Sequence, residues 1–499
     1  MKKVLTVLLS VMLILGFVLP VQAADGQTNE ETIPFTVVFK NSTLPGNMDK
    51  VIEDHGGELV YEIPEIGVVQ VEAPASFAKH AMKHSSIQVA SPSLVEKIPE
   101  VDSIPLETEG VNLEDAVLYE AYQWDIKRVT EDGNSFDLNT GNHDVVVGII
   151  DTGIDLNHPD VQQNLLPGSK NFVPAGGIDG VDQSETGDIT DVQDRNGHGT
   201  HVAGNIAGNG AILGVAPDTG FRAYRVFGAE GGAYSAWIMK AIVEAANDGV
   251  DVINMSLGGI YIKGQIWYTD PATGERMKMG NDVAEYVAYM RAAKYAEKKG
   301  ALIVTSAGND GLNASNKKEV LEFANEQYGP LGYEFVGAGF YTPASLPNVV
   351  TVSATGPNDE LSVYSNYGPG FIDVAAPGGD LKLYNEYMEN GNFDEYLNNR
   401  LFEQEFNLSS VPTVEYSYNE DGQIVDYTYT GPGYSWYVGT SMAAPKVSAV
   451  AALLFAEHEG ATPKKVKNLL QQSAEDIGKK GKDKYFGHGL SSAYRALMH

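Results

Sequence analysis

Five short and almost uninterrupted apolar runs constrain the fold of this chain more than any other feature of its sequence. Such runs are typical of strands buried on both faces of a parallel sheet. Helical patterns at 235–249 and 282–300 lie between successive runs. The alternation predicts an α/β domain with a doubly wound, mostly parallel sheet and helices on both faces. The runs are DVVVGIID (144–151), DVINMSLG (251–258), ALIVTSAGN (301–309), VVTVSA (349–354) and FIDVAAPG (371–378).

Polar residues stand at the carboxyl ends of three of these runs. In a doubly wound sheet, ligands bind beyond these ends, and Asp151, Ser256 and Asn309 occupy them. Ser441 is placed differently, because residues 439–460 are typical of a loop followed by a long apolar helix. Ser441 would lie in the first turn of that helix, where free amides and the helix dipole favour developing negative charge.

Three glycine-flanked motifs supply the residue types of a nucleophilic site. Asp151 lies in VGIIDTGID, His198 in NGHGTHVAG and Ser441 in GTSMAAP. A serine hydroxyl is a weak nucleophile until a base accepts its proton, and the base needs a third group to hold its ring in one tautomer. The three residues together could therefore form a catalytic triad.

In their chain order, Asp, His and Ser, the motifs resemble those of the subtilisin-like serine proteases, the subtilases, over residues 120–499. The resemblance implies that Asp151 orients the base, His198 is the general base and Ser441 is the nucleophile. His201, the second histidine of HGTH, is expected to pack within a helix rather than to act as a base.

The resemblance also implies an oxyanion hole and a substrate-binding edge. Asn309 in SAGND matches the oxyanion asparagine, with the Ser441 amide as a second donor. An extended substrate would pair with the SLGG edge by strand addition, and its glycines would allow close approach. This edge consists of Ser256, Leu257, Gly258 and Gly259.

Asp310 directly follows the oxyanion asparagine, at a position that resembles the rim of the primary specificity pocket. A carboxylate there could pair with an arginine or lysine just before the scissile bond. The chain carries 66 acidic and 34 basic residues, a net charge of −32, which would attract cationic peptides over longer distances. The same acidity could simply keep an exported protein soluble.

Metal binding is implied at one position only. Asp160 matches a calcium ligand of the family, so the resemblance implies a structural calcium there, while no cofactor is expected for the chemistry. The loop at 205–217 is shorter than in secreted subtilisins that bind calcium tightly. Calcium needs six to eight converging oxygen atoms, some of which would have to come from other segments.

The amino terminus is typical of a secretory signal peptide. Two lysines precede an apolar run at 4–20 and small residues follow, which predicts cleavage after Ala23 or Ala24. A retained membrane anchor is the alternative, but the run is short for a span. We therefore expect residues 1–24 to be a signal peptide and the mature protein to be secreted, extracellular, monomeric and free of the membrane.

The pattern after the signal predicts two further units before the catalytic domain at 119–499. Residues 25–97 show the order β-α-β-β-α-β of a ferredoxin-like α+β unit. This unit resembles the subtilase propeptide, which covers the active site and assists folding, although an ordinary accessory domain would show the same pattern. Residues 98–118 are rich in proline and acids and are expected to form a linker that contains the processing site.

Four segments lengthen the catalytic domain beyond a minimal subtilase, at 168–195, 260–281, 312–340 and 380–432. Long loops in a compact domain are usually functional or mobile, so we expect these segments to ring the substrate cleft. The first of them, together with YRVFG and the helix pattern at 238–249, resembles the lantibiotic leader peptidases. Those subtilases remove leader peptides from modified antimicrobial precursors.

Composition limits the remaining classes of function. The absence of cysteine excludes disulfides, thiolate catalysis and cysteine-bound zinc, and the strong negative charge argues against nucleic acid as a partner. The expected partners are a peptide or protein substrate and the chain's own propeptide. A secreted serine endopeptidase made as a self-processed precursor is the leading hypothesis. A broad degradative protease and a non-catalytic pseudoprotease that binds proteins remain the alternatives.

Overall fold

The computed structural model describes residues 32–74, 76–93, 95–98, 103–107, 113–269, 274, 276–280 and 283–499. The predicted signal peptide lies outside the described residues, as does much of the predicted linker. Within the described part of the chain, no helix is both long and apolar enough to cross a membrane.

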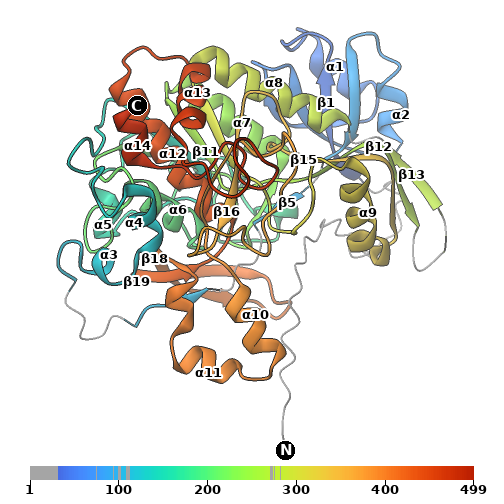
Figure 1. Ribbon diagram of the computed structural model, residues 1–499. Coiled ribbons are helices and arrows are strands. Elements are labelled where there is room, and N and C mark those ends of the chain that lie inside the picture. The colour runs from blue at the N-terminus through green and yellow to red at the C-terminus, as the bar shows by residue number, and fades with distance from the viewer. Residues whose placement is uncertain are drawn as a thin grey trace, which may run out of the picture.

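A seven-stranded parallel sheet forms the centre of the molecule (Figure 1). All five predicted apolar runs contribute a strand, so the predicted α/β fold is confirmed. The carboxyl ends of β7 and its neighbours lie at one edge, which brings Asp151 near the residues that follow β11 and β14. In spatial order the strands are β17 (Val374–Pro377), β16 (Val350–Thr355), β14 (Leu302–Ser306), β11 (Val252–Met255), β7 (Val146–Asp151), β9 (Gly220–Arg225) and β8 (Lys170–Asn171).

Helices cover both faces of the sheet because successive strand residues point to opposite sides. Val147 and Ile149 of β7 pack into one buried cluster, whereas Val146 and Ile150 pack into the other. The first face carries α4 (Trp124–Thr130), α6 (His198–Ala207), α12 (Thr440–Glu457) and α13 (Pro463–Ser473). The second face carries α7 (Ser235–Asn247) and α8 (Val283–Lys299).

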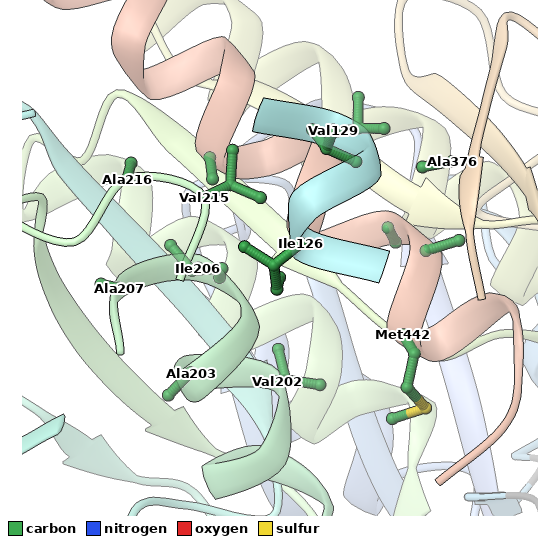
Figure 2. Close-up of a cluster of buried hydrophobic side chains, with 14 of the residues drawn as sticks. Ile126, Val129, Val202, Ala203, Ile206, Ala207, Val215, Ala216, Ala376 and Met442 are labelled. Carbon is green, nitrogen blue, oxygen red and sulfur yellow. The ribbon is translucent and has the colours of Figure 1, made fainter. Parts of the chain in front are cut away.

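The core of the first face fixes the two helices that carry His198 and Ser441. Ile126 and Val129 of α4 lie among apolar side chains of α6, and Met442 of α12 lies nearby (Figure 2). All of these side chains are buried. Because close-packed interiors resist displacement, this packing holds the starts of α6 and α12 in a fixed relation.

The N-terminal region forms a separate antiparallel sheet with the order β2-β3-β1-β4. Its elements follow the predicted β-α-β-β-α-β order, and its own apolar core lies between the sheet and its two helices. The other face packs against α7 and α8 of the large domain (Figure 1). The elements are β1 (Thr32–Phe39), α1 (Met48–Glu53), β2 (Glu58–Ile63), β3 (Val68–Pro74), α2 (Phe77–Ala81) and β4 (Ile87–Pro92).

Three of the four long segments are not the loops that the sequence suggests. Segments 260–281 and 312–340 pair to form a three-stranded sheet covered by α9, with apolar residues of both segments in one buried cluster. β12 forms the middle strand, because it pairs with β13 of its own segment and with β15 of the other. The elements are β12 (Gly259–Thr269), β13 (Arg276–Gly280), α9 (Lys317–Tyr328) and β15 (Tyr333–Thr342).

The segment at 380–432 also contains regular structure. It forms two short helices and most of a long hairpin below the central sheet in Figure 1. The hairpin takes a third strand, β6 (Ile104–Pro105), from the region predicted as a linker. The other elements are α10 (Lys382–Glu389), α11 (Phe393–Asn398), β18 (Asn407–Tyr418) and β19 (Ile424–Tyr437).

Candidate active site

Asp151 and His198 form a buried pair at the carboxyl end of β7. Asp151 is the last residue of β7 and His198 is the first residue of α6. Oδ1 of Asp151 lies 2.8 Å from Nδ1 of His198, and both side chains are almost fully buried. Asp151 Oδ1 also accepts a hydrogen bond from the Thr152 amide at 2.8 Å. A carboxylate held in this way fixes the orientation of the imidazole ring.

The glycine after His198 lets α6 approach β7 this closely. A Cβ atom at Gly199 would lie 2.3 Å from the carbonyl oxygen of Gly153, which is far inside van der Waals contact. The Gly199 amide instead donates to the hydroxyl of Thr152 at 2.8 Å. The HG pair of the motif therefore has a packing reason as well as a chemical one.

His201 packs within the helix, as the sequence predicts. Its ring stacks on Tyr437 with a centroid distance of 4.3 Å, and Nε2 lies 3.1 Å from the carbonyl oxygen of Asn407. Burial, with a smaller contribution from the nearby Lys446, holds the pKa of His201 well below its usual value. A neutral, enclosed ring of this kind serves packing.

Ser441 is the second residue of α12, so it lies in the first turn as predicted. Its hydroxyl donates to the carbonyl oxygen of Ser256 at 3.0 Å, and the Ser256 hydroxyl donates to the carbonyl oxygen of Ser441 at 2.8 Å. Pro445 lies one turn further along the helix and has no N–H to offer the Ser441 carbonyl. The hydroxyl of Ser256 replaces this missing helical donor.

Nε2 of His198 is buried and has no hydrogen-bond partner among the described residues. The hydroxyl of Ser441 points to Ser256 and does not hydrogen-bond to this nitrogen. The predicted role of Ser441 as nucleophile would require its hydroxyl to turn from the Ser256 carbonyl to His198.

The carboxamide of Asn309 is oriented by Thr440. Asn309 Oδ1 accepts hydrogen bonds from the Thr440 amide at 2.9 Å and from the Thr440 hydroxyl at 2.7 Å. Its Nδ2 is thereby left as a donor toward the space beside Gly439. A Cβ atom at Gly439 would lie 3.4 Å from Asn309 Nδ2 and 3.7 Å from the Ser441 nitrogen. Both nitrogen atoms thus lie beside the same position, and the oxyanion hole predicted for Asn309 and the Ser441 amide stays a prediction.

A pocket opens next to Ser441, and all of the predicted substrate-binding residues line it. Asp310 is part of its wall, and Oδ2 of Asp310 accepts hydrogen bonds from the Tyr341 hydroxyl at 2.5 Å and from Asn366 Nδ2 at 3.2 Å. Burial raises the pKa of Asp310, although these two hydrogen bonds oppose the rise. The lining residues include Ser256, Leu257, Gly258, Gly259, Asn309, Asp310 and Ser441.

Asp160 has protein partners that account for its position. Its Oδ2 accepts hydrogen bonds from the Ile212 amide at 3.1 Å and from the Tyr434 hydroxyl at 2.9 Å. No group of three or more His, Asp or Glu side chains that could hold a metal ion occurs in the part of the chain described above. The donors around Asp160 do not fit a calcium site, because they offer hydrogens rather than oxygen ligands to a cation. Calcium binding there stays a prediction without structural support.

Sequence reasoning missed two buried groups that shape the site. A hydrogen-bond chain leads from Ser448 through Asn254 to Ser256 and so ties α12 to β11. Glu185 in the segment 168–195 forms ion pairs with Arg225 and Arg195 and anchors that segment next to β9. Local sequence patterns could not predict either group, because the residues that contact one another come from separate elements of the chain.

Comparison with known proteins assigns the chain to a class, the subtilisin-like serine proteases. The model of the family described as the Subtilase family matches residues 142–489, and the chain belongs to this family. The predicted family resemblance is thereby confirmed, and so is the prediction that the protein is a serine protease.

Two relatives illustrate the similarity of sequence. The chain is 29% identical to the epidermin leader peptide-processing serine protease EpiP of Staphylococcus epidermidis over 485 residues, which cover 95% of each protein. It is 31% identical to the nisin leader peptide-processing serine protease NisP of Lactococcus lactis subsp. lactis over 480 residues. These residues make up 91% of this chain and 64% of NisP.

Solved structures show the same likeness. A crystal structure of a serine-to-alanine variant of EpiP from Staphylococcus aureus has a TM-score of 0.74 at 32% identity and covers 94% of this chain and 99% of its own. The crystal structure of the nisin leader peptidase NisP has a TM-score of 0.63 at 30% identity. It covers 77% of this chain and 95% of its own.

Proposed function

We propose that this protein is a secreted endopeptidase that removes the leader peptide from a lantibiotic precursor and is itself made as a self-processed precursor. The observation that carries the catalytic part is the buried Asp151–His198 pair. The names of EpiP and NisP support the leader peptide as substrate class. The protein acts as a monomer on peptide substrates.

The proposed reaction uses three side chains in fixed roles. His198 Nε2 takes the proton of the Ser441 hydroxyl as the oxygen attacks the scissile carbonyl carbon, while Asp151 holds the ring and stabilises its positive charge. Asn309 Nδ2 and the Ser441 amide bind the oxyanion. When the C–N bond breaks, His198 gives the proton to the leaving amine. Water then hydrolyses the acyl-enzyme by the same steps with water as the nucleophile.

Residues 25–97 act in this proposal as a propeptide that holds the precursor inactive. Its last strand, β5 (Val95–Lys97), pairs with β10 (Gly232–Tyr234) of the catalytic domain, and the Ile98 amide continues the pairing to Gly231. The chain then enters the predicted processing region after residue 98. A segment that binds as a substrate-like strand blocks access of other peptides until it is cut.

Asp310 gives the site its preference for a basic residue before the scissile bond. One carboxylate oxygen is held by Tyr341 and Asn366, which leaves Oδ1 to pair with a guanidinium or ammonium group in the pocket. Because burial raises the pKa of Asp310, the ionised form that binds a cation becomes scarcer as the pH falls.

The test uses a lanthionine-containing precursor with an arginine before the leader–core junction, and a matched precursor with leucine there. We expect the purified protein to release the intact core from the arginine form. Asp310→Asn should reduce the advantage of arginine over leucine by a factor of up to about ten. Ser441→Ala is the control for contaminating proteases. Cleavage at many sites within leader and core would favour the broad degradative protease instead.

A further inference from the structure

The N-terminal region places one acidic side chain in the substrate cleft. β5 lies antiparallel to β10, with Glu96 opposite Ala233. A Cβ atom at Gly259 would lie 3.5 Å from Cγ of Glu96, and Gly259 lines the same pocket as Ser441. Glu96 therefore extends from a bound strand into the wall of the cleft, a few residues before the predicted processing region.

Three hydroxyl groups of the catalytic domain surround the carboxyl group of Glu96. The hydroxyls of Tyr261 and Tyr289 donate to its Oε1, and the Ser235 hydroxyl lies 3.4 Å from the same oxygen. Ser235 and Tyr261 also hydrogen-bond to each other at 2.9 Å. Only 3% of Glu96 is exposed. A buried carboxyl group with several aligned donors is a specific contact, because each donor would lose a partner if an apolar side chain replaced it.

The pocket around Glu96 is built on rigid elements of the catalytic domain. Ser235 begins α7, Tyr261 lies in β12 and Tyr289 lies in the middle of α8. The aromatic rings of Tyr261 and Tyr289 meet edge to face at 5.6 Å, and both side chains are buried. This hydroxyl pocket, formed by Ser235, Tyr261 and Tyr289, thus belongs to the enzyme rather than to the N-terminal region.

We propose that the hydroxyl pocket is a substrate subsite that selects a glutamate side chain on the acyl side of the scissile bond, and that Glu96 occupies it in the precursor. The proposal rests on the proposed peptidase function and names a second specificity determinant besides Asp310. Strand pairing fixes which residue of a bound peptide faces the pocket, since alternate side chains of an extended strand point to opposite sides.

The charge around the pocket indicates the form in which the acid binds. Glu285 of α8 interacts electrostatically with both tyrosines, and burial raises the pKa of Glu96 to about 7 despite the hydrogen bonds from Tyr261, Tyr289 and Ser235. A neutral carboxyl group is therefore accommodated without a counter-ion below about pH 7. The preference for glutamate is expected to be strongest under mildly acidic conditions.

The experiment scans glutamate through the six positions before the scissile bond of one cleaved parent peptide, with alanine, leucine and aspartate peptides for comparison, at about pH 6. We expect one position at which glutamate raises kcat/KM about tenfold or more over the other three residues, the effect typical of hydrogen bonds to a carboxyl group. Tyr261→Phe/Tyr289→Phe should remove this advantage and bring kcat/KM for the glutamate peptide down to that for the alanine peptide. Tyr295→Phe is the matched control, because Tyr295 lies on α8 and its hydroxyl bonds to Asn247 outside the pocket.

Two outcomes would overturn the subsite. One is that glutamate gives no advantage at any position, in which case Glu96 would only hold the N-terminal region on the catalytic domain of the precursor. The other is a glutamate preference that survives in the double variant. Failure of the proposed peptidase function would give a different result, because the wild type would then cut no parent peptide faster than the Ser441→Ala variant does.

Discussion

Ser441 and Ser256 exchange hydroxyl-to-carbonyl hydrogen bonds, at 3.0 Å in one direction and 2.8 Å in the other. The exchange couples the first turn of α12 to the end of β11. It also compensates for Pro445, whose missing N–H leaves the Ser441 carbonyl without a helical donor. The position of the proposed nucleophile therefore depends on a residue of the predicted substrate-binding edge.

Replacing Ser256 by alanine tests this coupling. Ser256→Ala leaves a buried carbonyl oxygen unsatisfied, so the free energy of unfolding should fall by about 1–3 kcal/mol. kcat should also fall, because the start of α12 loses its fixed position. Urea unfolding and steady-state kinetics measure the two effects. Ser473→Ala is the control, since its hydroxyl bonds within α13 and its loss should leave kcat unchanged. Equal kcat values in both variants would contradict the coupling.

Ser441→Ala is expected to abolish peptide hydrolysis and to leave the precursor uncut between about residues 97 and 120. The reason is that the same nucleophile is proposed to release the N-terminal domain. Mass and N-terminal sequence of the purified variant decide the matter, and added wild-type enzyme should restore the cut if the site is accessible in trans. Normal processing without any added protease would refute self-cleavage.

Asn309→Ala should lower kcat by about 10²–10³-fold with little change in KM, the effect typical of removing one oxyanion donor. The oxyanion forms only in the transition state, so binding of the ground state should hardly change. Thr440→Val should give a smaller loss of the same kind, since Thr440 orients the carboxamide. Thr440→Ser keeps the hydroxyl and should retain activity. An unchanged kcat in Asn309→Ala would exclude this residue from the oxyanion hole.

Glu185 joins two buried guanidinium groups, with Arg225 at 2.7 Å and Arg195 at 3.0 Å. Glu185→Gln removes the carboxylate that pairs with Arg225 and one of the two that pair with Arg195, which also pairs with Asp191, and it should cost about 3–5 kcal/mol of unfolding free energy. Burial raises the pKa of Glu185, but its bonds and charge contacts with the arginines outweigh burial, and the pKa is lowered overall. Stability from this group is thus present above the unfolded-state pKa of 4.5 and is lost as the pH falls through the lowered value.

Denaturant unfolding at about pH 7 and about pH 3.5 measures both the cost of Glu185→Gln and the dependence of stability on pH. The wild type should lose stability in acid, and Glu185→Gln should lose less. Glu334→Gln is the surface control, because Glu334 and Arg276 form an exposed pair at 2.7 Å whose loss should cost at most about 1 kcal/mol. A loss in Glu185→Gln no larger than in this control would show that the buried pair contributes nothing specific.

Because Glu96 is buried, we expect the folded precursor to become less stable as the pH rises. Its pKa rises from 4.5 to about 7 on burial, so the folded precursor holds a proton that the unfolded chain has released. This contribution to stability is fully present below about pH 4.5 and is lost as the pH rises from there through about pH 7. It is on the order of 3–4 kcal/mol at about 1.4 kcal/mol per pKa unit. The free energy of unfolding of the Ser441→Ala precursor, measured from about pH 5 to about pH 8, should therefore fall as the pH rises.

The matched double variant Ser441→Ala/Glu96→Gln isolates that group. Glutamine keeps the shape and cannot titrate, so its precursor should show a flatter dependence on pH. Parallel curves for the two precursors would mean that Glu96 does not titrate in this range.

The sequence alone determined the class of fold and the residues of the candidate site. Buried parallel strands need apolar side chains on both faces, so the runs ending at Asp151 and near Ser256 and Asn309 were visible as local patterns. The glycine-flanked motifs around His198 and Ser441 were equally local. These features could be predicted because their chemistry is contained in a few neighbouring residues.

Only the tertiary structure decided which distant groups meet. The segments at 260–281 and 312–340 looked like loops, because a strand pattern is ambiguous until its partner strand is known. The exchange between Ser441 and Ser256, the orientation of Asn309 by Thr440 and the hydroxyl pocket around Glu96 all join residues far apart in the chain. Such contacts arise from the packing of whole elements, which sequence spacing does not specify.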